Sequence, residues 1–192
     1  IHRTPILESR ALNEIIGCEL VFKAENFQKV GAFKARGVCN AIFSMDKACL
    51  KKGVVTHSSG NHGAALALAS ALRGSPCTVV MPENAPSVKI AAVKGYGAKI
   101  VLCEPTMAAR ASNVAHLIEQ HGFRLVHPYD DDVIIAGQGT AALELLEQID
   151  QPPDIVMTPV GGGGLLGGTS IYVKGVSEAQ VIGAEPEGAK DA

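Results

Sequence analysis

The sequence predicts an α/β protein in which apolar strands alternate with helices and pair into mostly parallel sheets. Short apolar runs rich in valine and isoleucine recur between longer helical segments, most regularly over residues 54–128. Glycine is abundant at 21 residues, whereas aromatic residues are scarce at 4%, with no tryptophan. This pairing suits an α/β protein whose loops lie close to a small ligand.

The middle of the chain shows the alternation most clearly. Apolar strands with intervening helices indicate a parallel sheet that is covered on both faces. The expected strands are 54–57, 77–81, 99–103 and 124–126, and the expected helices are 64–72, 86–94 and 108–120.

The two ends of the chain have the pattern of a second α/β unit. A strand at 20–24 leads to a helix at 32–44, and the later elements are a helix at 139–148, a strand at 155–160, a helix at 165–175 and a strand at 181–185. We therefore expect a small domain at 54–128, inserted in a large domain made of 1–53 and 129–192. The chain begins with Ile and stops just after an apparent strand, so we expect a fragment whose large domain is incomplete.

The composition excludes several classes of protein. With 47% apolar and 19% charged residues, the 192-residue chain can bury a sizeable core, so it is not disordered. A net charge of −2 without basic clusters argues against a nucleic-acid partner. No apolar run approaches the ~18 residues of a membrane span, so no membrane partner is expected. The five cysteines are odd in number and widely spaced, which indicates free thiols and a cytoplasmic location.

One lysine lies on the apolar stripe of a predicted helix. At about 100° per residue, Lys34 shares its face with Val38 and Ala41, while Arg36 and Phe43 point the other way. Burial disfavours the charged amine, which turns it into a nucleophile for a carbonyl group. The alternative is a lysine near the helix start that extends its amine into water.

A polar turn joins a strand to a helix at 56–63, with the sequence THSSGNHG. Free amides at a helix start attract an anion such as a carboxylate. The alternative is an ordinary N-cap, for which a single polar residue would suffice. A Ser-His-Asp hydrolase is a weaker alternative, because the G-x-S-x-G motif is absent.

A run of four glycines, Gly161 to Gly164, lies between a strand and a helix, where backbone amides can wrap a phosphate. The alternative is an NAD(P)-binding oxidoreductase domain, because Gly162, Gly164 and Gly167 match G-x-G-x-x-G and Glu185 follows where a ribose ligand would lie. That alternative leaves Lys34 and the polar turn unexplained. Together, the three motifs meet the needs of an aldehyde that bears a phosphate.

The order of the segments GAFKARG, THSSGNHG, AGQGTAALELLEQ and PVGGGGLLGG resembles the fold-type II pyridoxal-phosphate enzymes, within the serine racemase and serine/threonine dehydratase group. The resemblance covers nearly all of the chain and includes HRTP near its start. It implies a tryptophan synthase β-like fold with two three-layer domains, whose C-terminal part is absent from this chain. It also implies racemisation of serine, elimination of water from serine- or threonine-type hydroxy amino acids to a 2-oxo acid and ammonia, a homodimer, and a nucleotide effector.

The resemblance implies a role for each motif. Lys34 would form the Schiff base with the cofactor aldehyde and remove the substrate α-proton, and Phe33 would flank the cofactor ring. Asn61 would hydrogen-bond the 3′-oxygen of the cofactor. The phosphate would be held by Gly161, Gly162, Gly163, Gly164 and Leu165, and the substrate carboxylate by Ser58, Ser59, Gly60, Asn61 and His62.

Two further roles follow from the resemblance. Racemases of the group carry a serine at the position of Ser59 and use it as the acid/base opposite the lysine, whereas biosynthetic threonine dehydratases usually read S-A-G-N-H. The sequence here is S-S-G-N-H, which favours the racemase branch. Glu185, Ala189 and Asp191 match the E-x-x-x-A/G-x-D pattern of a Mg²⁺ or Ca²⁺ site; the alternative is two solvated acids in a loop.

Overall fold

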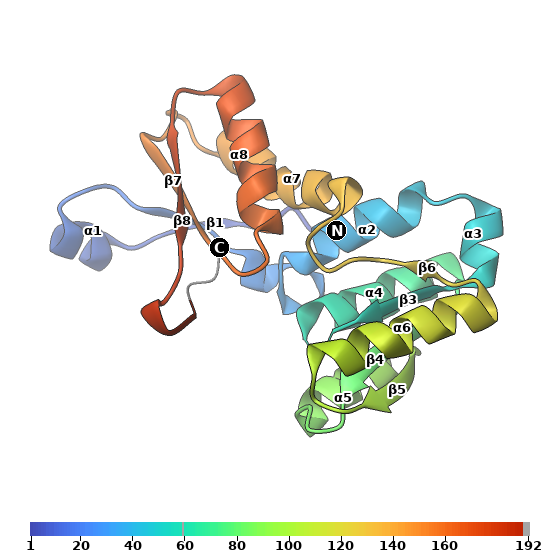
Figure 1. Cartoon of the computed structure of the whole chain (residues 1–192). Helices are drawn as coiled ribbons and strands as arrows, with labels where there is room; N and C mark the ends of the chain where they lie inside the picture. Colours follow the sequence, from blue (N-terminus) through green and yellow to red (C-terminus); the bar gives the residue numbers. More distant parts are fainter. Residues whose placement is uncertain (59, 190–192) are drawn as a thin grey trace.

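Four parallel strands form the largest sheet of the molecule (Figure 1). The structure is a computed structural model, and it describes residues 1–58 and 60–189. Two predicted site residues, Ser59 and Asp191, therefore lie outside the described residues. The strands are β3 (Val54–His57), β4 (Cys77–Pro82), β5 (Lys99–Cys103) and β6 (Arg124–Leu125), in the spatial order β5-β4-β3-β6.

Helices cover both faces of this sheet, as the apolar strands predict. Successive side chains of a strand point to opposite faces, so Val54 packs in the cluster under α4 (Asn61–Arg73) and α5 (Ser87–Gly95), whereas Val55 packs under α6 (Met107–His121). The predicted α/β class with mostly parallel strands is confirmed. No helix among residues 1–58 and 60–189 is long and apolar enough to cross a membrane.

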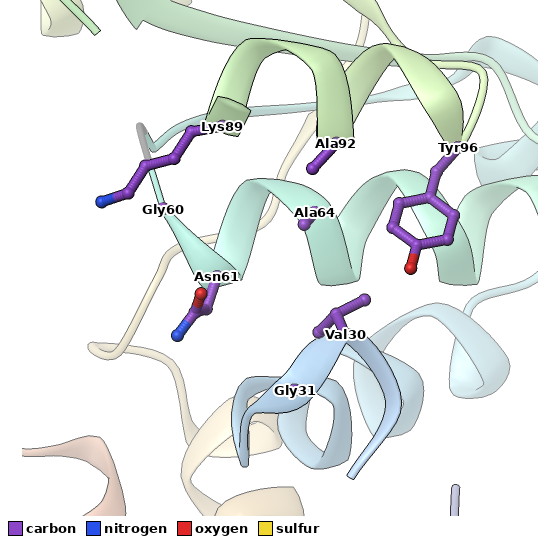
Figure 2. Close-up of a pocket in the computed structure, with 8 residues that line it drawn as sticks. All are labelled: Val30, Gly31, Gly60, Asn61, Ala64, Lys89, Ala92 and Tyr96. Carbon is purple, nitrogen blue, oxygen red and sulfur yellow. The ribbon is translucent and has the colours of Figure 1, made fainter. Parts of the chain in front are cut away.

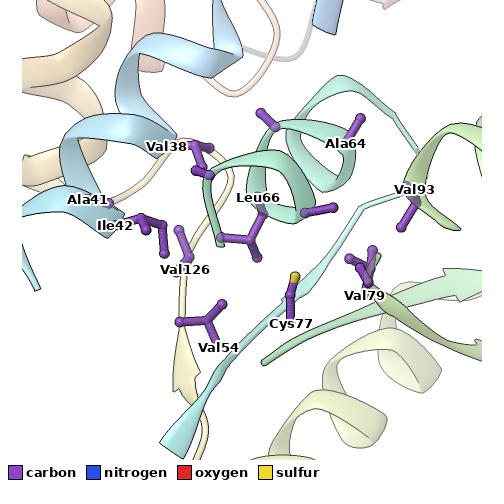
Figure 3. Packing of buried hydrophobic residues seen from close by; sticks show 14 of the residues in the cluster. Val38, Ala41, Ile42, Val54, Ala64, Leu66, Cys77, Val79, Val93 and Val126 are labelled. Atoms are coloured by element: carbon purple, nitrogen blue, oxygen red, sulfur yellow. The ribbon is translucent and has the colours of Figure 1, made fainter. Parts of the chain in front are cut away.

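The larger hydrophobic cluster extends beyond the sheet to α2 (Lys34–Ser44), the helix that begins with the predicted lysine. Val38 and Ile42 of α2 are fully buried and lie in the same cluster as Leu66 of α4 and Val54 of β3 (Figure 3). This cluster holds α2 against the sheet unit. Because it joins residues on both sides of residue 53, the division into two domains stays a prediction.

Helix α7 (Asp132–Gln148) packs against α2 on one side and α8 (Gly164–Val176) on the other (Figure 1). The remaining elements complete the part of the chain that the structure describes. They comprise the antiparallel pair β1 (Ile6–Glu8) and β2 (Val21–Lys23), the parallel pair β7 (Ile155–Pro159) and β8 (Gln180–Ala184), the helices α1 (Arg10–Ile16) and α3 (Lys47–Lys52), and the 3₁₀ turns η1 (Glu25–Phe27), η2 (Lys29–Gly31) and η3 (Glu187–Ala189).

The prediction for α7 is wrong at its start, which the sequence placed at residue 139. The helix begins seven residues earlier because the Asp131 side chain accepts hydrogen bonds from the amides of Val133 (2.9 Å) and Ile134 (3.3 Å). The additional turns place the glycine-rich segment 137–139 in the interior of the helix.

Arg36 has a different environment from the one its helix position suggested. It lies on the face of α2 opposite Lys34, as predicted. That face is also buried, and Arg36 is only 1% exposed. Its guanidinium donates to Glu25 at 2.7 Å and to Glu144 at 2.8 Å, and Lys23 donates to Glu144 at 2.7 Å. Burial by itself raises the pKa of Glu144, but hydrogen bonds from Arg36 and Lys23 outweigh it and lower this pKa to about 2. The ionised Glu144 therefore stabilises the folded protein above its ordinary pKa of 4.5, and this contribution to the free energy of unfolding is lost as the pH falls toward 2.

We expect Arg36→Met to lower the free energy of unfolding by about 3–5 kcal/mol, because it leaves the buried Glu144 and the half-buried Glu25 without their main partner. Urea denaturation at pH 7 measures this change. The control is Arg10→Met, since the Arg10 side chain is 92% exposed and pairs with Glu14 on the surface; its effect should stay within about 0.5 kcal/mol. Equal effects of the two substitutions would contradict the proposed importance of the buried cluster.

Candidate active site

The predicted motifs meet at the carboxyl ends of two neighbouring strands, β3 and β6. Ligand sites of parallel α/β sheets commonly lie at this edge. The polar turn follows β3, and residues 126–129 follow β6. We call these four residues, Val126 to Tyr129, the 126–129 segment.

Lys34 points from the first turn of α2 to the 126–129 segment. Its Nζ donates to the carbonyl oxygen of Pro128 at 2.7 Å and lies 5.2 Å from the centre of the Phe33 ring. The residue is half-buried, and burial lowers the pKa of its amine. The neutral, nucleophilic form is therefore more populated than in an exposed lysine. The sequence also allowed an amine that extends into water, but Nζ instead donates to the Pro128 carbonyl.

The backbone before Lys34 is unusual. Val30 has φ 58° and Gly31 φ 70°, so two successive residues are in the left-handed region. A valine rarely adopts this conformation, and such strain is common near functional sites. The resulting turn precedes Phe33 and leads into α2.

The start of α4 carries the polar turn. Gly60 is the N-cap residue and no side chain caps the helix, so the ordinary N-cap that the sequence allowed is absent from the described part of this turn. The first amides of α4 are therefore available to an anion. Ser58 accepts a hydrogen bond from the Gly60 amide at 3.2 Å, and the Asn61 side chain is exposed at the helix start.

His62 is buried beneath this turn at 2% exposure. Its Nε2 lies 3.1 Å from the carbonyl oxygen of Val126 and donates to it, which leaves Nδ1 as the unprotonated nitrogen. Within the described part of the chain, Nδ1 has no hydrogen-bond partner. Burial, together with the nearby charge of Lys34, lowers the pKa of His62 to about 3. The imidazole is thus neutral and ties α4 to the 126–129 segment.

The glycine run forms the start of α8. Gly163 is the N-cap residue with φ 78°, and no side chain caps this helix. A side chain at Gly161 or Gly163 would meet open space, whereas one at Gly162 would run into the Tyr129 ring. The first amides of α8 have no acceptor within the helix, so the loop can hold a phosphate on its open side.

The 126–129 segment contacts all three predicted motifs. The carbonyl of Val126 accepts from His62, the carbonyl of Pro128 accepts from Lys34, and the Tyr129 ring lies against Gly162. The sequence patterns did not predict this segment; Pro128, shortly after the end of β6, was a local signal of a special turn. A half-buried amine and two uncapped helix starts around one segment fit an aldehyde that bears a phosphate.

An open cavity of about 310 Å³ adjoins the polar turn. Asn61 and Lys89 lie at one end of this cavity and Tyr96 at the other, with the strained Val30 between them (Figure 2). The cavity extends the site from the start of α4 toward α5.

The predicted metal ligands are only partly described. Glu185 follows β8, Ala189 ends η3, and Asp191 lies outside the described residues. Among residues 1–58 and 60–189, no group of three or more His, Cys, Asp or Glu side chains is arranged to hold a metal ion.

The glycine run does not favour the dinucleotide alternative. Elements β7, α8 and β8 do form a parallel βαβ unit. However, a Cβ on Gly164 would lie 3.1 Å from the Tyr129 carbonyl oxygen, so backbone fills the side of this glycine that a pyrophosphate would have to approach.

Comparisons with known proteins identify relatives of the chain. The whole chain is 57% identical to the serine racemase of Dictyostelium discoideum and 51% identical to the beta-hydroxyaspartate dehydratase of Paracoccus denitrificans. It spans 59% and 61% of these relatives, respectively, or about three fifths of their length.

Solved structures share the fold. The Dictyostelium serine racemase matches 97% of this chain with a TM-score of 0.93 at 56% identity, and 61% of that chain is covered. Maize serine racemase matches 99% with a TM-score of 0.97 at 44% identity, and 58% of that chain is covered. The processed form of threonine deaminase isoform 2 from Solanum lycopersicum matches 96% with a TM-score of 0.91 at 34% identity, and 51% of that chain is covered.

These matches bear out the fold-type II resemblance and give no support to the NAD(P)-binding alternative. The sequence model of the family described as "Pyridoxal-phosphate dependent enzyme" matches residues 1–192, the full length of the chain. The chain therefore belongs to the family of pyridoxal-phosphate dependent enzymes.

Proposed function

We propose that the intact protein uses pyridoxal phosphate to racemise serine and to eliminate water from serine- or threonine-type hydroxy amino acids. The observation that carries this proposal is the half-buried amine of Lys34, held 2.7 Å from the Pro128 carbonyl between the two uncapped helix starts. Relatives named serine racemase at 57% and 50% identity support racemisation. Relatives named for hydroxyaspartate dehydration or ammonia-lyase activity support elimination.

Lys34 performs the proton chemistry in this proposal. When bound, pyridoxal phosphate supplies an electron sink that stabilises negative charge at the substrate α-carbon. Because burial lowers the pKa of Lys34, its Nζ is available in the neutral form that attacks an aldehyde and accepts a proton. The Pro128 carbonyl holds Nζ in place, and Phe33 flanks the cofactor ring.

The two helix starts bind the anionic groups. The amides of Gly161, Gly162, Gly163, Gly164 and Leu165 hold the cofactor phosphate at the positive end of α8. The polar turn at the start of α4 holds the substrate carboxylate through Ser58, Ser59, Gly60, Asn61 and His62. The Asn61 side chain, which lines the cavity of Figure 2, hydrogen-bonds the 3′-oxygen of the cofactor.

Ser59 supplies the second proton-transfer group. Racemisation requires a proton donor on the substrate face opposite Lys34, whereas elimination requires only the lysine and a protonated leaving group. The sequence S-S-G-N-H supports this role for Ser59.

Several finer features rest on the sequence patterns and on the family resemblance. We propose that Glu185, the Ala189 carbonyl and Asp191 hold Mg²⁺ or Ca²⁺, whose preferred ligands are oxygen atoms. The intact protein is proposed to be a cytoplasmic homodimer with a nucleotide effector. Its residues 54–128 are proposed to form a small domain within a large domain of 1–53 and 129–192.

We expect Lys34→Ala to abolish both activities, because no other residue takes over the covalent attachment of the cofactor. Borohydride reduction of the wild type followed by peptide mass spectrometry should locate the cofactor on Lys34. Lys47→Ala, at an exposed lysine of α3, is the control and should retain both activities. In the apoprotein, Lys34 should react with an acylating reagent at lower pH than Lys47, since its pKa is lowered. Cofactor attached elsewhere, or a wild type that retains NAD(H) instead, would contradict the proposal.

Ser59→Ala should reduce interconversion of D- and L-serine by about 10²–10⁴-fold, the usual contribution of a general acid or base. Elimination from L-serine to pyruvate should remain within about tenfold of wild type, because that reaction needs no donor on the second face. Chiral chromatography and a pyruvate assay on the same samples measure the two rates. An equal loss of both activities would leave Ser59 as a binding residue only.

A chelator should lower both the melting temperature and the activity, and Mg²⁺ or Ca²⁺ should restore them, because two carboxylates repel each other without the cation. Asp191→Asn should remove most of this response. Glu187→Gln, in the same acidic segment but outside the ligand pattern, should keep it. If Asp191→Asn leaves the chelator response intact, the metal site is wrong.

A further inference from the structure

Helix α7 contains the segment Gly137-Gln138-Gly139, to which neither the family resemblance nor the proposed function gives a role. Helix α7 packs most extensively against α2, which begins with Lys34, and α8, which begins at the glycine loop. We propose that this segment sets the distance between Lys34 and the phosphate-binding loop, so that one rigid cofactor reaches both. The inference rests on the proposed function and adds three positioning residues to it.

Gly137 faces α2 at backbone contact distance. A Cβ on Gly137 would lie 2.5 Å from the Cα of Gly37 and 2.9 Å from the carbonyl oxygen of Arg36. The contact is mutual, because a Cβ on Gly37 would lie 2.6 Å from the carbonyl oxygen of Ile134. Gly37 is three residues after Lys34, so this contact fixes the turn of α2 that carries the amine.

Gly139 faces α8 in the same manner. A Cβ on Gly139 would lie 2.8 Å from the carbonyl oxygen of Gly168, and one on Gly168 would collide with the carbonyl oxygen of Ile135. Gly168 lies about one helical turn after the glycine loop, at the first turns of α8. The position of the loop relative to α7 is therefore fixed by backbone contact as well.

The geometry of an α-helix explains why two glycines two residues apart can serve two neighbours. At about 100° per residue, residues 137 and 139 lie about 200° apart and so on opposite faces of α7. Gln138, at 1% exposure, accepts a hydrogen bond from the Gly37 amide at 3.1 Å. The carbonyl four residues before this amide, that of Phe33, accepts a hydrogen bond from the Arg36 amide at 2.9 Å. Gln138 therefore holds the same turn of α2 that Gly137 approaches.

The cofactor makes this spacing necessary. Its aldehyde and its phosphate are attached to one aromatic ring, so their separation does not adapt to the protein. An added methyl at Gly137 or Gly139 would force the backbones apart by roughly 0.5–1 Å to reach ordinary contact distance. A displacement of about 1 Å in a positioned group costs about 10²-fold in function.

The test compares pyridoxal phosphate with pyridoxal, which has the aldehyde but no phosphate. Apoprotein of the intact chain is titrated with each ligand, and the visible absorbance gives the dissociation constants. For Gly137→Ala and Gly139→Ala, we expect the affinity for pyridoxal phosphate to fall by about 10²-fold, whereas that for pyridoxal changes by less than about threefold. The control is Gly175→Ala in α8, where an added methyl meets open space; it should keep the wild-type preference for the phosphorylated ligand.

An unchanged preference in the folded glycine variants would overturn the inference, and so would an equal loss of both ligands. Melting temperatures of the apoproteins establish folding. If the alanine variants do not fold, Gln138→Met decides, since it keeps a similar volume and removes the side-chain amide whose oxygen accepts from Gly37. Its preference for pyridoxal phosphate should fall several-fold, and an unchanged preference would overturn the inference. A wild type that attaches neither ligand to Lys34 would refute the proposed function itself.

Discussion

A buried guanidinium needs carboxylate partners, and this requirement brings distant segments of the chain together around Arg36. Its hydrogen bonds join η1 through Glu25 and the C-terminal part of α7 through Glu144, and Lys23 of β2 donates to the same Glu144. Arg36 lies two residues after Lys34. The cluster therefore fixes the start of α2 from one side, while the hydrophobic cluster with Val38 fixes it from the other.

Much of the fold could be predicted from the sequence, because its strands are short apolar runs and the predicted helices α4 and α6 end at glycines. Every strand of the four-stranded sheet lies within a residue or two of its predicted place. The missed elements, α1, α3 and the first turns of α7, have little apolar periodicity. They are instead marked by side-chain caps at Ser9, Asp46 and Asp131. The capping residues predict where these helices begin, whereas the apolar periodicity does not.

The candidate site was predictable in its residue types but not in its connections. The local sequence was enough to recognise the lysine, the polar turn and the glycine run. Binding of an aldehyde, a carboxylate or a phosphate each needs a particular residue type in a particular element. The 126–129 segment could not, because its contribution comes mainly from two backbone carbonyls, which every residue possesses. The burial of Arg36 was hidden for a related reason: its carboxylate partners are 11 and 108 residues away in sequence.

Strand β6 has only two residues, and Pro128 follows shortly after it. It is also an outer strand of the four-stranded sheet, where unpaired backbone groups offer a template for another chain. Here the carbonyls that a longer strand would have exposed are turned toward His62 and Lys34. The arrangement that serves the reactive amine thus also leaves this edge too short for a foreign strand, and protects the protein against edge-to-edge aggregation.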